Sequence, residues 1–183
     1  SAYQIIKSLV NTTPDLRICG DTMMVVSPDE GGISRAMYYA SMLGVPLGTF
    51  YKRRDYTQVV NGRNPIIAHE FLGDTVEGMD IIVVDDMISS GDSMLDIARE
   101  LKSRKANRIF CATTFGLFTD GLEHFNQAYE QGLITKVFAT NLIYRRPELL
   151  AAPWFQDVNM AKFVALLIDA INHDASLSRL MSP

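Results

Sequence analysis

Short apolar runs alternate with amphipathic segments along most of the chain. The clearest run is residues 81–84, four consecutive β-branched side chains, which is typical of a strand buried on both faces. The apolar spacing that follows predicts a helix over about residues 91–104. Similar patterns predict strands at 23–26, 47–51, 109–114, 137–140 and 155–158, and helices at 2–10, 33–43, 121–131 and 160–172.

Strands that alternate with helices predict an α/β fold, a doubly wound, mainly parallel sheet with helices on both faces. Residues 55–69 look irregular, but a tight-turn signal at Asn61 and Gly62, between apolar pairs at 59–60 and 66–67, is also consistent with a mobile hairpin. A short edge strand is expected at Phe71 and Leu72. Residues 141–153 are expected to form a loop. In the last helix, the side chains expected to face inward are Phe163, Leu166, Leu167, Ala170 and Ile171.

Composition narrows the function classes. The 183 residues suit one domain, and 17 basic against 21 acidic residues give a net charge of −4, which argues against a general nucleic-acid binder. The two cysteines, Cys19 and Cys111, have no metal-ligand or CxxC spacing, so we expect reduced thiols in a cytoplasmic protein. No apolar run approaches the length of a membrane span, so no membrane partner is expected.

Candidate chemistry follows the strand at 81–84. Asp85 and Asp86 come next, and a small, hydroxyl-rich loop at 89–93 then leads into the predicted helix. Free N–H groups at a helix N-terminus bind phosphate, and adjacent carboxylates bind sugar hydroxyls or magnesium. The alternative is a solvated loop start in which Ser90 is only an N-cap.

Two other predicted strands also end in polar residues. The turn at 27–32 contains Asp29, a candidate metal ligand or binder of a hydroxylated substrate, although the segment is also good turn chemistry. Lys52, Arg53 and Arg54 follow the next strand, either as a solvated turn or as cations that stabilise a transferring phosphoryl group. Since parallel strands end at one edge of a sheet, we expect the three groups to form an active site there.

These residues resemble a known family. The segment VDDMISSGDS at 84–93 is similar to the ribose-phosphate-binding signature of type I phosphoribosyltransferase folds. Three more segments resemble ribose-phosphate pyrophosphokinases (phosphoribosyl pyrophosphate synthetases), and they are SPDEGGISRA at 27–36, YKRR at 51–54 and FLGDTVEG at 71–78. Ordinary phosphoribosyltransferases carry the signature without the first two of these segments.

The resemblance implies magnesium-dependent transfer of diphosphate from ATP to ribose 5-phosphate, with release of AMP. It implies that Asp85 and Asp86 hold the ribose hydroxyls, and that Asp29 lies near the ribose and magnesium. Lys52 and Arg54 would act as catalytic charge stabilisers on the ATP phosphates. The residues that would cradle the 5-phosphate are Ser89, Ser90, Gly91, Asp92 and Ser93. It also implies a homo-oligomer, a dimer or hexamer.

The chain departs from the family in several places. It resembles only the second of the family's two domains, so we expect residues 1–183 to be a single domain without its N-terminal partner and with low activity alone. Asp92 stands where the family mostly has glycine, and we expect its side chain to point away from the phosphate. Thr114 and Phe115 replace the usual Thr-His pair, which puts allosteric control in doubt. The alternatives are a phosphoribosyltransferase and a non-catalytic regulatory homologue.

Overall fold

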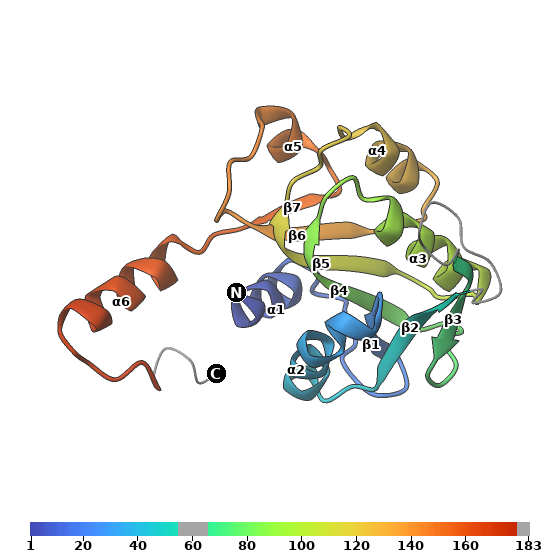
Figure 1. The fold of residues 1–183 in the computed structure, drawn as a ribbon, viewed down its shortest axis with the longest axis horizontal. Helices are drawn as coiled ribbons and strands as arrows, with labels where there is room; N and C mark the ends of the chain where they lie inside the picture. The colour runs from blue at the N-terminus through green and yellow to red at the C-terminus, as the bar shows by residue number, and fades with distance from the viewer. Residues whose placement is uncertain (55–65, 179–183) are drawn as a thin grey trace.

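A computed structural model describes the backbone of residues 1–54 and 66–178, and the side chains of residues 1–51 and 70–178. The described residues contain a seven-stranded sheet in the order β3-β2-β1-β4-β5-β6-β7 (Figure 1). Neighbouring strands are parallel except β2 and β3, which are antiparallel. The predicted doubly wound, mainly parallel α/β fold is therefore confirmed.

The elements follow the predicted alternation. The strands are β1 (Met23–Ser27), β2 (Leu47–Arg54), β3 (Ile66–Leu72), β4 (Asp80–Ile88), β5 (Ile109–Gly116), β6 (Lys136–Thr140) and β7 (Phe155–Val158). The helices are α1 (Ala2–Thr12), the short 3-10 helix η1 (Glu30–Gly32), α2 (Ile33–Leu43), α3 (Asp92–Ser103), α4 (Glu123–Glu130), α5 (Pro147–Ala151) and α6 (Ala161–Asn172). None of the helices in the described part of the chain has the length and apolar character needed to cross a membrane.

Two hydrophobic clusters, one on each face of the sheet, hold the fold together. Successive side chains on a strand point to opposite faces of the sheet, so alternate residues of β4 contribute to different clusters. Ile81 and Val83 belong to the cluster that α3 and α4 cover, whereas Ile82 and Val84 belong to the cluster that α1 and α2 cover. Figure 1 shows these two helix pairs on either side of the sheet.

Strand β4 is longer than predicted. Pairing with β5 continues past the apolar run, through Asp85 opposite Thr113, to Ile88 opposite Gly116. The acidic pair therefore lies inside the strand, not after it. Backbone pairing does not require apolar side chains, so the change from apolar to acidic residues marked the edge of the core and not the end of the strand.

Two other predictions of local structure were wrong. Strand β3 begins at Ile66, so part of the segment expected to be irregular pairs with β2, while the turn expected at Asn61 and Gly62 lies outside the described residues. The expected loop at 141–153 contains α5, with Pro147 in its first turn, where proline is well tolerated.

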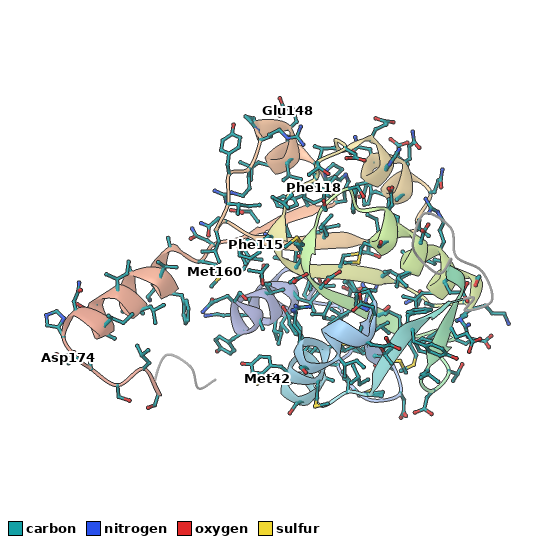
Figure 2. The ribbon with its side chains drawn as sticks, in the orientation of Figure 1. Met42, Phe115, Phe118, Glu148, Met160 and Asp174 are labelled. Atoms are coloured by element: carbon teal, nitrogen blue, oxygen red, sulfur yellow. The ribbon has the colours of Figure 1, made fainter. Side chains whose placement is uncertain are left out.

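The range of the last helix, 160–172, was predicted correctly, and Ala170 is buried as expected, but part of its expected buried face was wrong. Leu166 and Ile171 were expected to face the core, yet they are 43% and 59% exposed, and α6 extends away from the sheet in Figure 1. Figure 2 shows Met160 at the sheet end of this helix and Asp174 at its far end. The inner part of the helix is still anchored, because Phe163 and Val164 pack against the cluster under α1 and α2.

Candidate functional site

The candidate site lies where β1, β2 and β4 end. Strand β1 pairs with both neighbours, with Ser27 opposite Thr49 of β2 and Val26 opposite Val83 of β4. The chain then turns into η1, which contacts both β2 and β4. The segments that carry Asp29, Lys52 and the acidic pair thus continue from adjacent parallel strands at one edge of the sheet.

Asp29 shapes the turn after β1. Its Oδ1 accepts a hydrogen bond from the Gly32 backbone N–H at 3.1 Å, as an N-cap does, and the Ser27 hydroxyl donates to the Asp29 carbonyl oxygen at 2.7 Å. A Cβ at Gly32 would come within 2.7 Å of Ser27 Oγ, so the turn is closely packed. One carboxylate oxygen of Asp29 is therefore used by the fold, and its role as a metal ligand stays a prediction.

An arginine that was not predicted as a site residue joins the acidic pair. Arg35 on α2 places Nη1 3.5 Å from Asp85 Oδ1 and Nη2 3.4 Å from Asp86 Oδ2. These distances indicate ion pairs and not close hydrogen bonds. Each carboxylate also accepts a backbone N–H at 2.8 Å, from Asp86 to Asp85 and from Met87 to Asp86. Arg35 therefore spans two adjacent charges that would otherwise repel each other.

The two carboxylates have different acidities. Burial raises the pKa of Asp85 to about 6, against the opposing effect of the Arg35 charge. Desolvation also acts to raise the pKa of Asp86, but the interaction with the Asp85 side chain, the charge of Arg35 and the Met87 backbone N–H outweigh it and leave that pKa lowered. Near neutral pH both groups carry negative charge, and Asp85 is the one that takes up a proton on mild acidification.

The predicted phosphate loop is held at a glycine. Gly91 is the N-cap of α3 and has φ of +97°, a conformation that glycine adopts readily and other residues do not. A Cβ at this position would lie 2.2 Å from Cε2 of Phe125 on α4. The Thr119 N–H also donates to the Ser89 carbonyl oxygen at 3.0 Å. Packing and backbone bonding therefore fix the path of the loop.

An aromatic cluster packs against the core side of this loop. Phe118 meets Phe125 edge to face with ring centroids 5.0 Å apart, and Phe125 stacks on Trp154 at 5.2 Å. Figure 2 shows Phe118 beside the strand end of β5. Trp154 is fully buried, and its Nε1 donates a hydrogen bond to Asn126 Oδ1 at 2.8 Å.

Asp92 begins α3, and 64% of its side chain is exposed. Ser90 Oγ donates to its Oδ2 at 3.3 Å, and His124 Nδ1 on α4 lies 3.7 Å from its Oδ1. The carboxylate thus lies between the loop hydroxyl of Ser90 and the first turn of α4, and its orientation away from a bound phosphate stays a prediction. Ser89 and Ser93 are exposed, and Ser90 is half-buried, so their hydroxyls are open to a ligand at the helix N-terminus.

The predicted catalytic cations are placed only by their backbone. Lys52 and Arg54 belong to β2 and pair with β3, opposite His69 and Ile66, but their side chains lie outside the described residues. Their contact with a substrate stays a prediction. Just before them, the Tyr51 hydroxyl donates to Glu70 Oε2.

The donor set suits one kind of metal site. Among the side chains of residues 1–51 and 70–178, no three His, Cys, Asp or Glu residues are grouped to hold an ion by themselves. Magnesium, however, is usually bound by one or two carboxylates, with water and substrate phosphates supplying the remaining oxygens. Within this site, Asp29 with its second carboxylate oxygen, or the adjacent pair Asp85 and Asp86, fits that pattern.

Comparison with known proteins gives a consistent result. A family model described as a phosphoribosyl transferase domain matches residues 1–137. A curated ribose-phosphate pyrophosphokinase of Mycoplasma pneumoniae is 30% identical over 85% of this chain and 45% of its own length, and one of Shewanella oneidensis is 31% identical over 88% and 49%. The chain therefore spans about half the length of these curated relatives.

Two solved structures show the same fold. The phosphoribosylpyrophosphate synthetase of Mycobacterium smegmatis matches 94% of this chain and 51% of its own, with a TM-score of 0.73 and 23% identity. An adenine phosphoribosyltransferase matches 75% of this chain and 76% of its own, with a TM-score of 0.52 and 18% identity.

Proposed function

The chain belongs to the phosphoribosyl transferase domain family, and on this basis we propose that it is the ribose 5-phosphate-binding part of a ribose-phosphate pyrophosphokinase. The observation that carries the proposal is the acidic pair on β4, spanned by Arg35 and followed by the Gly91 loop at the N-terminus of α3. The names of the half-matched relatives support the same activity. The reaction transfers diphosphate from ATP to the 1-hydroxyl of ribose 5-phosphate and releases AMP.

In this proposal the two acids bind the ribose and the loop binds the 5-phosphate. Asp85 and Asp86 accept hydrogen bonds from the ribose hydroxyls. The free N–H groups of the first turn of α3, with the hydroxyls of Ser89, Ser90 and Ser93, hold the 5-phosphate, because a helix N-terminus carries partial positive charge. Gly91 lets the loop keep its left-handed turn close against Phe125, since its position has no Cβ.

Catalysis then rests on positioning and charge. Bound magnesium would neutralise phosphate charge and polarise the transferring group. Asp29 would be its protein ligand, while Lys52 and Arg54 stabilise negative charge that develops on the ATP phosphates. The protein supplies little covalent chemistry in such a transfer, so the fixed path of the loop and the Arg35 contact are its main contributions.

Calorimetric titration with ribose 5-phosphate and Mg²⁺ tests the proposal. We expect binding that unphosphorylated ribose does not give, and an at least tenfold loss of affinity in Asp86→Asn. Asp96→Asn is the matched control, because Asp96 is an exposed acid on α3 that pairs with Arg99. Equal affinity for ribose and ribose 5-phosphate would refute the proposed site.

A phosphoribosyltransferase that consumes the pyrophosphorylated sugar is the second candidate, favoured by the family match itself. Release of AMP from ATP supports the pyrophosphokinase, and release of pyrophosphate from the activated sugar supports the transferase. Assembly as a homo-oligomer, action in the cytoplasm and low activity of this chain alone stay predictions of the same proposal.

A further inference from the structure

Asp92 places a negative charge in the loop that is proposed to bind phosphate. We propose that His124 is the positioning residue that makes this acid tolerable. Its imidazole holds the Asp92 carboxylate toward α4 and, when protonated, neutralises it while the phosphate is bound. The inference rests on the proposed function, because it assigns His124 a part in ribose 5-phosphate binding.

The two oxygens of Asp92 have different partners. Oδ2 accepts a hydrogen bond from the Ser90 hydroxyl at 3.3 Å, and the Asp92 N–H donates back to Ser90 Oγ at 3.4 Å. Oδ1 lies 3.7 Å from His124 Nδ1, which is within ion-pair distance but too long for a hydrogen bond. The carboxylate therefore lies between a loop hydroxyl and the first turn of α4.

Substrate binding changes this arrangement because Ser90 has only one hydroxyl proton to donate. In the present structure that proton goes to Asp92, so the acid occupies the donor that a bound phosphate would use. When Ser90 turns to the phosphate, Asp92 loses its hydroxyl partner and faces a second anion. His124 is then the neighbouring group able to balance the charge.

The other charged groups near Asp92 do not take over the role of His124, because each has a different partner. The charged groups in the first two turns of α3, the turn before α4 and the start of α4 are Asp92, Asp96, Arg99, Asp120 and Glu123. Arg99 is paired with Asp96, Thr119 Oγ1 donates to Asp120 Oδ1 at 3.0 Å, and Glu123 accepts a hydrogen bond from Gln127 Nε2 at 2.9 Å. Asp92 is thus the acid that His124 meets.

The space between the helices permits the movement. A hollow of about 320 Å³ separates α3 from α4, and Asp92, Arg99, His124 and Gln127 line it. Asp92 and His124 are 64% and 60% exposed, so either side chain can turn without disturbing the core. A shift of Asp92 into this hollow would take its charge away from the N-terminus of α3.

A double-mutant cycle tests the inference. The four proteins are the wild type, His124→Gln, Asp92→Asn and the double variant, each titrated with ribose 5-phosphate at pH 6.0 and pH 8.0. The two pH values bracket the range in which histidine side chains ordinarily change charge, so the comparison varies the charge available to balance Asp92. Ratios of Kd at a single pH remove the titration of the substrate phosphate, because all four proteins bind the same ligand.

We expect His124→Gln to weaken binding about two- to fivefold at pH 6.0, the range for an exposed ion pair, and to change it little at pH 8.0. In the Asp92→Asn background the same substitution should have no effect at either pH. His173→Gln is the matched control, because His173, the C-cap residue that follows α6, also faces an acid, with Nδ1 3.2 Å from Asp169 Oδ1, but lies far from the proposed site in the sequence.

Equal effects of His124→Gln in both backgrounds, or at both pH values, would show that His124 is only structural and would overturn the inference. An effect no larger than that of His173→Gln would also overturn it. Failure of all four proteins to bind ribose 5-phosphate would overturn the proposed function as well, which separates the two failures.

Discussion

A methyl group added at Gly91 tests how the phosphate loop is built. Gly91→Ala places a side chain at φ of +97° and a Cβ 2.2 Å and 2.5 Å from two ring atoms of Phe125. Left-handed backbone in a non-glycine residue costs about 1–2 kcal/mol, and overpacking a core adds about 1–3 kcal/mol. Phe125 is fully buried against Trp154, so its ring cannot move into solvent.

We therefore expect Gly91→Ala to lower the free energy of unfolding by about 2–5 kcal/mol, measured by urea denaturation. The loop should also shift enough to weaken ribose 5-phosphate binding by at least tenfold. Gly121→Ala is the control, because Gly121 has a similar φ of +87° but no atom within 4 Å of its Cβ position. Its cost should be the backbone strain alone, about 1–2 kcal/mol.

Equal losses of stability in Gly91→Ala and Gly121→Ala would refute this reasoning. They would mean that the Phe125 ring yields to the new methyl group and that backbone conformation alone selects glycine. A destabilised Gly91→Ala protein that still binds ribose 5-phosphate normally would separate stability from function, and would show that the loop path is not what positions the phosphate.

Three further predictions concern charged groups. Burial raises the pKa of Asp85 to about 6 from 3.8, so the folded state holds this proton more tightly than the unfolded chain does. The free energy of unfolding, measured in urea and taken relative to Asp85→Asn, should therefore fall by about 1 kcal/mol as the pH rises from about 4 to about 6. Arg35→Gln should weaken ribose 5-phosphate binding about tenfold in calorimetry while changing stability by less than about 1 kcal/mol, since its ion pairs are partly exposed. Asp80→Ala should cost about 3 kcal/mol in urea denaturation, because it leaves Arg108 without its buried partner at 2.7 Å.

Matched variants separate these effects from general damage. Arg99→Gln removes an exposed arginine of α3 and should leave binding unchanged, so an equal loss in both arginine variants would contradict the role of Arg35. Asp15→Ala removes the other, 72% exposed partner of Arg108 and should cost less than about 1 kcal/mol. For Asp85, a stability difference that does not change between pH 4 and pH 6 would contradict the raised pKa.

The sequence predicted the interior of the fold well because apolar runs and helical spacing are local signals. It failed where tertiary contact decides. Asp85 and Asp86 looked like the end of a strand, but pairing with β5 carries the strand past them. Residues Leu166 and Ile171 form an apolar stripe, yet periodicity identifies only a stripe and not the surface that covers it.

The candidate site was predictable in part for the same reason. The glycine loop and the acidic pair are contiguous, so their chemistry can be read from one segment. Arg35 reaches the acids across 50 residues of sequence, and His124 meets Asp92 across 32 residues. Only the placement of α2 beside β4, and of α4 beside α3, brings these side chains together, and no local pattern encodes it.

The stack of Phe125 on Trp154 gives the molecule a built-in optical reporter. Trp154 is the one tryptophan in the chain, its indole is fully buried, and the ring that it stacks on is the ring that touches the Gly91 position. Any displacement of the loop by an arriving phosphate is therefore passed to a single fluorophore through one intervening side chain. Intrinsic emission from Trp154 should follow loop occupancy in real time, without a label or a coupled assay.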